Sequence, residues 1–154
     1  MNEYMQKAIE AARRGVEANR GGPFGAVIVR DGEIVAVAHN DVLGTNDPTA
    51  HAEIVAIREA SRKLGRFHLE DCAIYSTCEP CPMCLFAIHW AGIRTLYFGA
   101  DRHDSALGGF DDDYCYRLMA GIADSPLLSP TIIDREPCRA LFLEWNQKPD
   151  RTMY

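Results

Sequence analysis

The sequence predicts an α/β fold, a three-layer α/β/α sandwich around a mixed sheet of about five strands. Short runs rich in β-branched residues alternate with stretches of helical apolar spacing, after an initial hairpin. With 154 residues, 47% of them apolar, the chain can bury a sizeable core. No linker, repeat or low-complexity tract divides it. We therefore expect a single domain over residues 1–154.

The N-terminal part reads as a helix followed by a hairpin. Apolar residues at helical spacing predict a helix from about Glu3 to Gly15. Two β-branched runs, Phe24–Arg30 and Glu33–His39, predict strands. Asp31-Gly32 between them is a strong hairpin signal, because both residues tolerate the positive φ angles of a tight turn.

Two further helices are expected in the centre of the chain. Asn40–Thr49 is a polar loop, and helical apolar spacing returns over Ala50–Leu64, where Gly65 closes the helix. A second central helix should run from Pro82 to about Ala91. Proline suits the first turn of this helix, where its missing N–H leaves no hydrogen bond unmade.

The remaining elements complete the alternation of strands and helices. Cys72–Ser76 and Thr95–Gly99 are short apolar runs that predict strands. The C-terminal part predicts a helix over Asp113–Ala120, a strand around Thr131–Asp134 and a last helix from about Cys138 to Gln147. The hairpin pair, these two central strands and the C-terminal strand make up the five expected strands.

The charge balance argues against a nucleic-acid partner. The net charge is −6, whereas proteins that grip a phosphate backbone usually carry a basic face. One basic concentration lies at helical spacing and is interrupted by Glu59 and Glu70, so a solvated helix face is the better interpretation. Its members are Arg58, Arg62, Lys63, Arg66 and His68.

No apolar run is long enough to span a membrane, so no membrane partner is expected. Six cysteines could indicate a disulfide framework, but a core of this size does not need such links. We therefore expect a reducing, cytoplasmic location.

Two segments, TAHAEI (Thr49–Ile54) and CEPCPMC (Cys78–Cys84), carry metal-site chemistry. Cys81 and Cys84 are three residues apart at a helix start and can bind one ion, with His51 as the third ligand. Three such ligands suit a catalytic Zn²⁺, one per subunit, with a fourth position left open. Glu53, two residues after the histidine, is not needed as a ligand and suits a proton-transfer role.

A closed zinc site that only holds the fold would need a fourth Cys or His. His68, His89 and His103 are present, but none forms a paired motif. Cys78 is interpreted as a small buried residue, with a ligand or reactive thiol as the alternative. The isolated cysteines are read as core or near-core residues; they are Cys72, Cys115 and Cys138.

At HAE and PCPMC the sequence resembles the zinc-dependent cytidine deaminase superfamily, whose pattern is H-x-E…P-C-x-x-C. GGPFGAVIV, NDPTAHAE, CEPCPMCLFAIHWA and GFDDDY further resemble its bacterial guanine deaminase branch. The resemblance implies a cytidine deaminase-like fold and hydrolytic deamination of guanine to xanthine and ammonia, in purine breakdown or salvage. Zinc would activate a water, and Glu53 would carry its proton to the ring and to the departing amine.

The resemblance also implies a substrate-binding set. It contains Asn40, Phe24, Ala52, Trp90, Asp112 and Tyr154. For three of these residues a purely structural role remains an alternative. Asn40 could be a turn or cap residue, and Phe24 could be an ordinary core residue. Asp112 could be one of three acids, with Asp111 and Asp113, in a solvated loop. The same branch implies a homodimer that exchanges C-terminal segments, so that Tyr154 could come from a partner chain.

Other functions remain compatible with these motifs. A deaminase of cytosine, guanosine or an aminotriazine such as ammeline would share them, and so would a transfer-RNA adenosine deaminase, although the net charge disfavours that substrate. A non-catalytic zinc module would be expected to lack the glutamate, and Glu53 is present. A small-molecule nucleobase is therefore the expected substrate.

Overall fold

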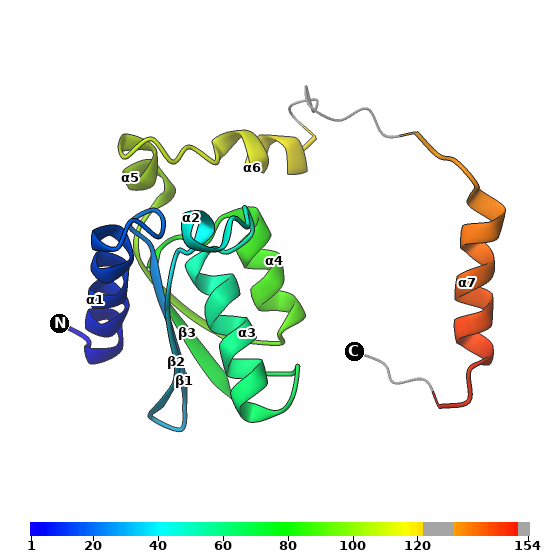
Figure 1. Cartoon of the computed structure of the whole chain (residues 1–154), viewed down its shortest axis with the longest axis horizontal. Coiled ribbons are helices and arrows are strands. Elements are labelled where there is room, and N and C mark those ends of the chain that lie inside the picture. Colours follow the sequence, from blue (N-terminus) through cyan, green and yellow to red (C-terminus); the bar gives the residue numbers. More distant parts are fainter. Residues whose placement is uncertain (122–130, 151–154) are drawn as a thin grey trace.

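The structure is a computed structural model that describes residues 1–121 and 131–150. A four-stranded mixed sheet lies between helices on its two faces, with α1 (Glu3–Glu17) on one side and α3 (Ala52–Leu64) and α4 (Pro82–Trp90) on the other (Figure 1). The predicted three-layer α/β/α architecture is confirmed.

The sheet has the strand order β2-β1-β3-β4. β1 (Gly25–Arg30) pairs antiparallel with β2 (Glu33–His39) and with β3 (Cys72–Cys78), and β3 pairs in parallel with β4 (Thr95–Ala100). The predicted hairpin is present, and Asp31 and Gly32 have the positive φ angles that a tight turn of this kind requires.

The core lies on both faces of β1, which explains the unbroken apolar run in its sequence. Ile28 and Ile74 pack on one face against α3, while Val27 and Val29 pack on the other against α1. The buried residues of α1 are all small, and the helix approaches the sheet so closely that a Cβ atom at Gly25 would overlap the backbone of Ala8.

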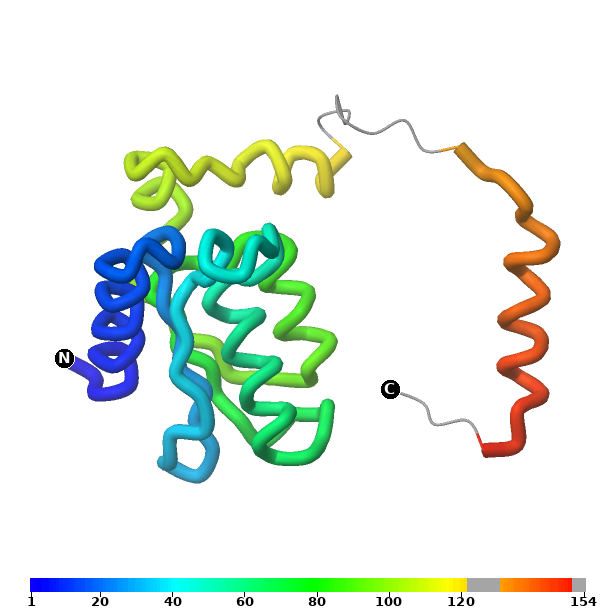
Figure 2. The backbone as a smooth tube through the Cα atoms, viewed as in Figure 1, coloured from blue at the N-terminus to red at the C-terminus, as the bar shows by residue number. Residues whose placement is uncertain are grey.

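Four helices complete the described chain. The polar loop after β2 contains one turn of helix, α2 (Val42–Thr45), and α5 (Arg102–Leu107) follows β4; neither was predicted. α6 (Asp113–Met119) and α7 (Arg135–Gln147) lie close to their predicted ranges. Among the described residues α7 packs against no other element, and it stands apart from the sheet and its helices (Figure 2).

Two expectations were wrong. The described residues form a four-stranded sheet, not a five-stranded one, because Thr131–Asp134 forms no strand. This β-branched run leads into α7, away from the sheet, so no neighbouring strand is available to hydrogen-bond its backbone. Cys115 and Cys138 are exposed, whereas they were expected in or near the core, because α6 and α7 bury no residue in this chain. Cys72 and Cys78 are buried as expected.

No helix in the described parts of the chain combines the length and the apolar character needed to cross a membrane.

Candidate metal centre and the adjoining cavity

His51, Cys81 and Cys84 come together at one end of the sheet, with one ligand atom from each lying within 4.8 Å of the others. The Nδ1 atom of His51 is 3.6 Å from Sγ of Cys81 and 3.5 Å from Sγ of Cys84. Two ligands of one tetrahedral zinc ion, with a nitrogen at ~2.0–2.1 Å and a sulfur at ~2.3 Å, are separated by roughly 3.6 Å. The three side chains therefore fit zinc.

Two helix starts build this cluster. His51 is the residue before α3, and Cys81 is the residue before α4, with Cys84 in its first turn. Both helices direct the positive ends of their dipoles at the cluster, which favours thiolates there. Hydrogen bonds with Cys84 and then His51 lower the pKa of Cys81 to about 4. The cluster is thus prepared to bind a cation through sulfur.

Glu53 lies in the first turn of α3 and is only 6% exposed. Its Oε1 atom accepts a hydrogen bond of 3.2 Å from the hydroxyl of Ser76 on β3. Burial raises the pKa of the Glu53 carboxyl group. A carboxyl group beside a metal site with a raised pKa is suited to accept and return a proton near neutral pH.

A cavity of about 630 Å³ opens beside the three ligands, and His51, Glu53 and Cys81 form part of its wall. Asn40, from the end of β2, and Phe24, from the loop before β1, line the same cavity. The ring of Phe24 meets that of Phe110 edge to face, with centroids 4.9 Å apart. The cavity thus offers flat aromatic walls together with polar groups, as sites for small planar molecules do.

The acidic stretch before α6 contributes to the cavity unequally. Asp111 and Asp112 both line it, and Asp113 does not. The Oδ1 atom of Asp112 is buried and has no hydrogen-bond partner among the described residues. Burial raises the pKa of this carboxyl group, and the nearby Cys81 adds to the effect. An unpaired buried acceptor of this kind is costly to the fold, which indicates that it is kept for a ligand.

Three expected site residues lie elsewhere. Ala52 is fully buried between His51 and Glu53 and does not line the cavity. Trp90 is the last residue of α4, is 73% exposed and is likewise absent from the cavity wall of this chain. Tyr154 lies outside the described residues.

The cavity also contains residues that the sequence did not assign to substrate binding. Cys78 is buried beside the metal cluster without belonging to it, and its thiol points to the backbone carbonyl of Asp101. Leu43, Pro48, Ser105 and Phe110 complete the wall from loops and short helices. Phe110 stands directly before the three aspartates, and an aromatic residue beside an acidic stretch is a signal that could have been noticed.

Comparisons with known proteins agree with this geometry. The sequence model of the cytidine and deoxycytidylate deaminase zinc-binding region matches residues 1–100. Guanine deaminase of Bacillus subtilis (strain 168) is 51% identical over 129 residues, which cover 84% of this chain and 80% of that protein. A transfer-RNA-specific adenosine deaminase of Aquifex aeolicus (strain VF5) is 44% identical over 97 residues, 63% of this chain and 64% of that protein.

The fold comparison leads to the same group of proteins. The crystal structure of the Bacillus subtilis guanine deaminase superimposes with a TM-score of 0.93, covering 100% of this chain and 99% of the other. The two sequences are 41% identical in this alignment, which spans the whole chain.

Proposed function

This chain belongs to the cytidine and deoxycytidylate deaminase family, and from that premise we propose that it hydrolyses guanine to xanthine and ammonia. The observation that carries the choice of guanine is the 51% identity to a guanine deaminase over 84% of the chain. The cavity supports it, because a carboxylate oxygen of Asp112 has no hydrogen-bond partner within residues 1–121 and 131–150, and guanine carries N–H donors.

His51, Cys81 and Cys84 are the proposed zinc ligands. Zinc held there supplies Lewis-acid activation of a water molecule at neutral pH. Glu53 takes the proton of that water and passes protons to a ring nitrogen and to the departing amine. Water thus adds at C2 of guanine, the C2–N bond breaks, and the amine leaves as ammonia. Ser76 holds one oxygen of Glu53 and so aims the other.

The other cavity residues are proposed to bind and orient the base. Phe24 supplies an aromatic wall, Asn40 hydrogen-bonds the ring edge, and Asp112 accepts from an N–H group of guanine. Ala52 does not line the cavity, so no side-chain contact with the base is proposed for it. A site that hydrogen-bonds its substrate discriminates strongly, because an analogue without the matching group leaves a buried polar atom unpaired.

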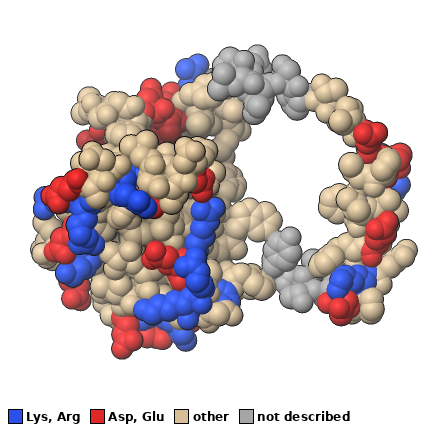
Figure 3. Space-filling model, in the orientation of Figure 1, with Lys and Arg blue, Asp and Glu red and all other residues tan. Residues whose placement is uncertain are grey.

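A transfer-RNA substrate is the main alternative, since relatives of that specificity match 63% of the chain. The basic residues of α3 and of the loop that follows it give it little support. Arg58 pairs with Asp47 and Arg66 pairs with Asp71, and acidic side chains lie among the basic ones on the face shown in Figure 3. Positive charge that is neutralised locally contributes little to phosphate binding.

A substrate panel tests the proposal. Ammonia release is measured with guanine, guanosine, cytosine, cytidine, adenosine, ammeline and transfer RNA, using zinc-loaded protein. We expect guanine to give the highest kcat/KM. Release from transfer RNA without release from guanine would reverse the assignment.

We also propose a homodimer in which C-terminal segments are exchanged between subunits, with Tyr154 and Trp90 acting at the partner's site. Two exposed apolar faces support it: Phe86 and Trp90 on α4, and Leu141 and Phe142 on α7. Monomers rarely expose so many large apolar side chains close together. The free state of all six cysteines supports a reducing, cytoplasmic location.

The dimer is tested by substitution on α4. Trp90→Glu places a charge on the proposed interface, so we expect sedimentation equilibrium to report a shift from dimer to monomer. Leu107→Glu is the matched control, because Leu107 is an apolar residue on α5 that is even more exposed than Trp90. A wild-type protein that sediments as a monomer would remove this part of the proposal.

Exchange of segments has its own test. Glu53→Gln and Tyr154→Ala proteins, each inactive, are unfolded together and refolded. If Tyr154 acts at the partner's site, mixed dimers contain one complete site and regain activity. No regain in a mixture shown to contain mixed dimers would contradict the exchange.

A further inference from the structure

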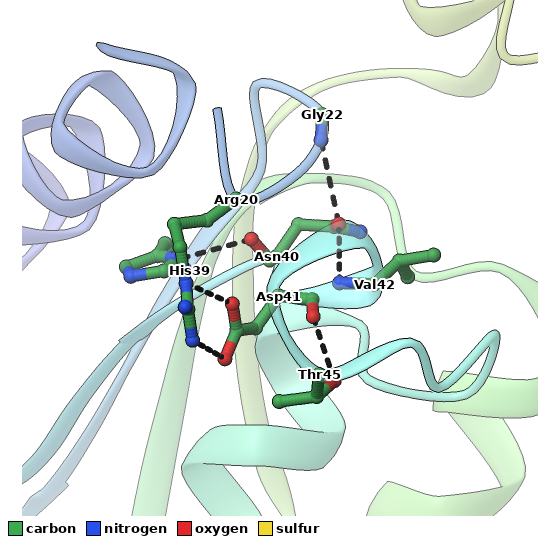
Figure 4. A network of polar contacts seen from close by, with 7 residues as sticks. All are labelled: Arg20, Gly22, His39, Asn40, Asp41, Val42 and Thr45. Atoms are coloured by element: carbon green, nitrogen blue, oxygen red, sulfur yellow. Dashed lines mark hydrogen bonds and ion pairs between the residues drawn. The ribbon is translucent and has the colours of Figure 1, made fainter. Parts of the chain in front are cut away.

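The side-chain amide of Asn40 is held from one side. Its Oδ1 atom accepts hydrogen bonds of 3.3 Å from the backbone N–H of Gly22 and 3.3 Å from that of Val42 (Figure 4). A backbone N–H can only donate, so the amide atom that faces both groups must be the oxygen. Among the described residues both hydrogen bonds of this side chain go to its oxygen and none to its nitrogen, and Asn40 lines the cavity. Asn40 therefore offers a ligand a donor and no acceptor.

The two segments that hold this amide are fastened to each other by an ion pair. The guanidinium of Arg20 donates to both carboxylate oxygens of Asp41, from Nε at 2.6 Å and from Nη2 at 2.8 Å (Figure 4). Arg20 directly precedes Gly21-Gly22, and Asp41 lies between Asn40 and Val42. The ion pair thus joins the two backbone segments whose N–H groups bind the amide. A two-point contact of this kind fixes orientation as well as distance.

Backbone contacts also join these two segments, Arg20–Gly22 and Asn40–Val42, whose connection is called the junction below. The carbonyl of Arg20 accepts from the N–H groups of Leu43, at 2.9 Å, and Gly44, at 3.0 Å. Gly44 leaves room for the guanidinium, because a Cβ atom there would overlap both Arg20 and Asp41. The junction is therefore specific to arginine in its shape as well as its charge.

Gly21 leaves the space that the Asn40 oxygen occupies. A Cβ atom at Gly21 would overlap Oδ1 of Asn40 and crowd the backbone carbonyl of the same residue. A side chain at position 21 would therefore push the amide out of reach of Gly22 and Val42. Gly21 is needed for this close approach, since its φ angle is not one that excludes other residues.

We propose that Arg20, Asp41 and Gly21 are positioning residues that fix the amide of Asn40 with its NH₂ group toward the substrate. The inference deepens the proposed function and rests on it. It implies that the base must present a ring acceptor, a nitrogen or carbonyl oxygen, to Asn40. An analogue with a donor at that place meets a second donor and is rejected.

The kinetic test compares two acids that each pair with arginine. Asp41→Asn weakens the junction, so we expect KM for guanine to rise about tenfold, the equivalent of one lost hydrogen bond, with kcat nearly unchanged. Asp71→Asn is the matched control, because Asp71 pairs with Arg30 and Arg66 at the far end of β3 from the metal ligands. This variant should leave KM unchanged.

A double-mutant cycle separates positioning from general stability. In an Asn40→Ala background the junction has no amide to orient, so Asp41→Asn should have no further effect on KM. Arg20→Lys, which keeps the charge but loses the fork, should raise KM less than Arg20→Ala. An equal rise from Asp41→Asn in both backgrounds, or no rise in either, would overturn the proposal.

The inference that Asn40 offers the substrate a hydrogen-bond donor has a separate test. Asn40→Asp can still accept from Gly22 and Val42 but turns its second oxygen, an acceptor, toward the base. We expect it to raise KM more than Asn40→Ala, which leaves only a gap. A KM for Asn40→Asp below that of Asn40→Ala would contradict the donor-only contact.

The assignment of guanine as substrate and the positioning role can fail separately, and the two failures give different results. Wild-type protein that releases no ammonia from guanine contradicts the proposed function, and the junction is then judged by crystal structures of wild-type and Asp41→Asn protein. Loss of the Asn40 contacts with Gly22 and Val42 in the variant supports the positioning role. An unmoved amide overturns it.

Discussion

The proton-transfer role proposed for Glu53 is indicated first by its neighbours in the sequence and then by its surroundings in the fold. It follows His51, a proposed metal ligand, by two residues, lies in the first turn of α3 and is buried beside the cluster of His51, Cys81 and Cys84. Its Oε1 atom accepts a hydrogen bond from the hydroxyl of Ser76, and its carboxyl group also contacts the thiol of Cys84. The carboxyl group thus lies directly beside the proposed metal site, where a proton-transfer group is needed.

Replacing Glu53 by glutamine tests this role. Glu53→Gln keeps the size of the side chain and can still accept from Ser76, so zinc content should be unchanged. We expect kcat to fall by about 10²–10⁴-fold, the usual contribution of a general acid–base group. Elemental analysis and ammonia release measure the two quantities. Substantial turnover in a zinc-replete variant would exclude the role.

Asp112 is proposed to bind the substrate at a cost to the stability of the fold. Burial raises its pKa in the folded state above the unfolded value, so the ionised form is disfavoured by folding. Its contribution to stability is fully present below the unfolded pKa of about 3.9 and is lost as the pH rises through the folded pKa. At neutral pH the carboxylate is therefore a cost to the fold.

Asp112→Asn should accordingly have a higher Tm than wild type at pH 7, and the gain should shrink as the pH is lowered toward 4. The same change removes the charged acceptor, so KM for guanine should rise by about tenfold or more. Differential scanning fluorimetry over a pH series and steady-state kinetics measure both effects. A lower Tm at pH 7 would contradict the assignment of Asp112 as an unpaired buried acid.

At the scale of elements, α6 is tied to the segment that carries the metal ligands. The hydroxyl of Tyr116 donates to the carbonyl of Pro80 at 2.8 Å, directly before Cys81. Burial raises the pKa of Tyr116 to about 12, so the phenol stays protonated as a donor. The guanidinium of Arg102 lies over the same ring, 4.7 Å from its centroid. These contacts set where Asp112, the residue before α6, meets the cavity.

Tyr116→Phe removes the hydroxyl and keeps the ring. The lost hydrogen bond should cost about 1 kcal/mol of unfolding free energy and should raise KM, because α6 and Asp112 lose one anchor. Tyr97→Phe, on the exposed edge strand β4, is the control and should change neither quantity. Urea unfolding and kinetics are the measurements. An unchanged KM would show that α6 is positioned by other contacts.

For the whole molecule, a metal ion would join two helices that are adjacent in space but thirty residues apart in the chain. His51 precedes α3 and Cys81 precedes α4, so zinc links both to one point. A ligand bound only by the folded state stabilises it, by about 4 kcal/mol at 1,000 times its Kd. Metal binding and folding are therefore coupled.

Removing zinc should lower the Tm and abolish ammonia release together, and adding zinc should restore both. Calorimetry of chelator-treated protein, with magnesium as the control addition, measures this. A Tm that is the same with and without zinc would mean that the cluster does not hold the metal in the folded protein.

The sequence allowed most of the central fold to be predicted, because β1 to β4 and the three large helices have strong local patterns. The C-terminal third was predicted less well. Thr131–Asp134 has the composition of a strand, but a strand needs a neighbour to bond with, and composition does not show whether one is present. Cys115 and Cys138 were misplaced for the same reason, since burial depends on which surfaces meet.

What the sequence determined by itself is the chemistry of the site. The residue types of His51, Glu53, Cys81 and Cys84 indicate which groups can bind metal and move protons, and the three-residue spacing of Cys81 and Cys84 puts these two on one helix face. Only the tertiary structure decided what surrounds them: that Asp112 faces the cavity while Trp90 does not, and that Asn40 presents its donor. Those facts depend on contacts between segments far apart in the chain, which no local pattern encodes.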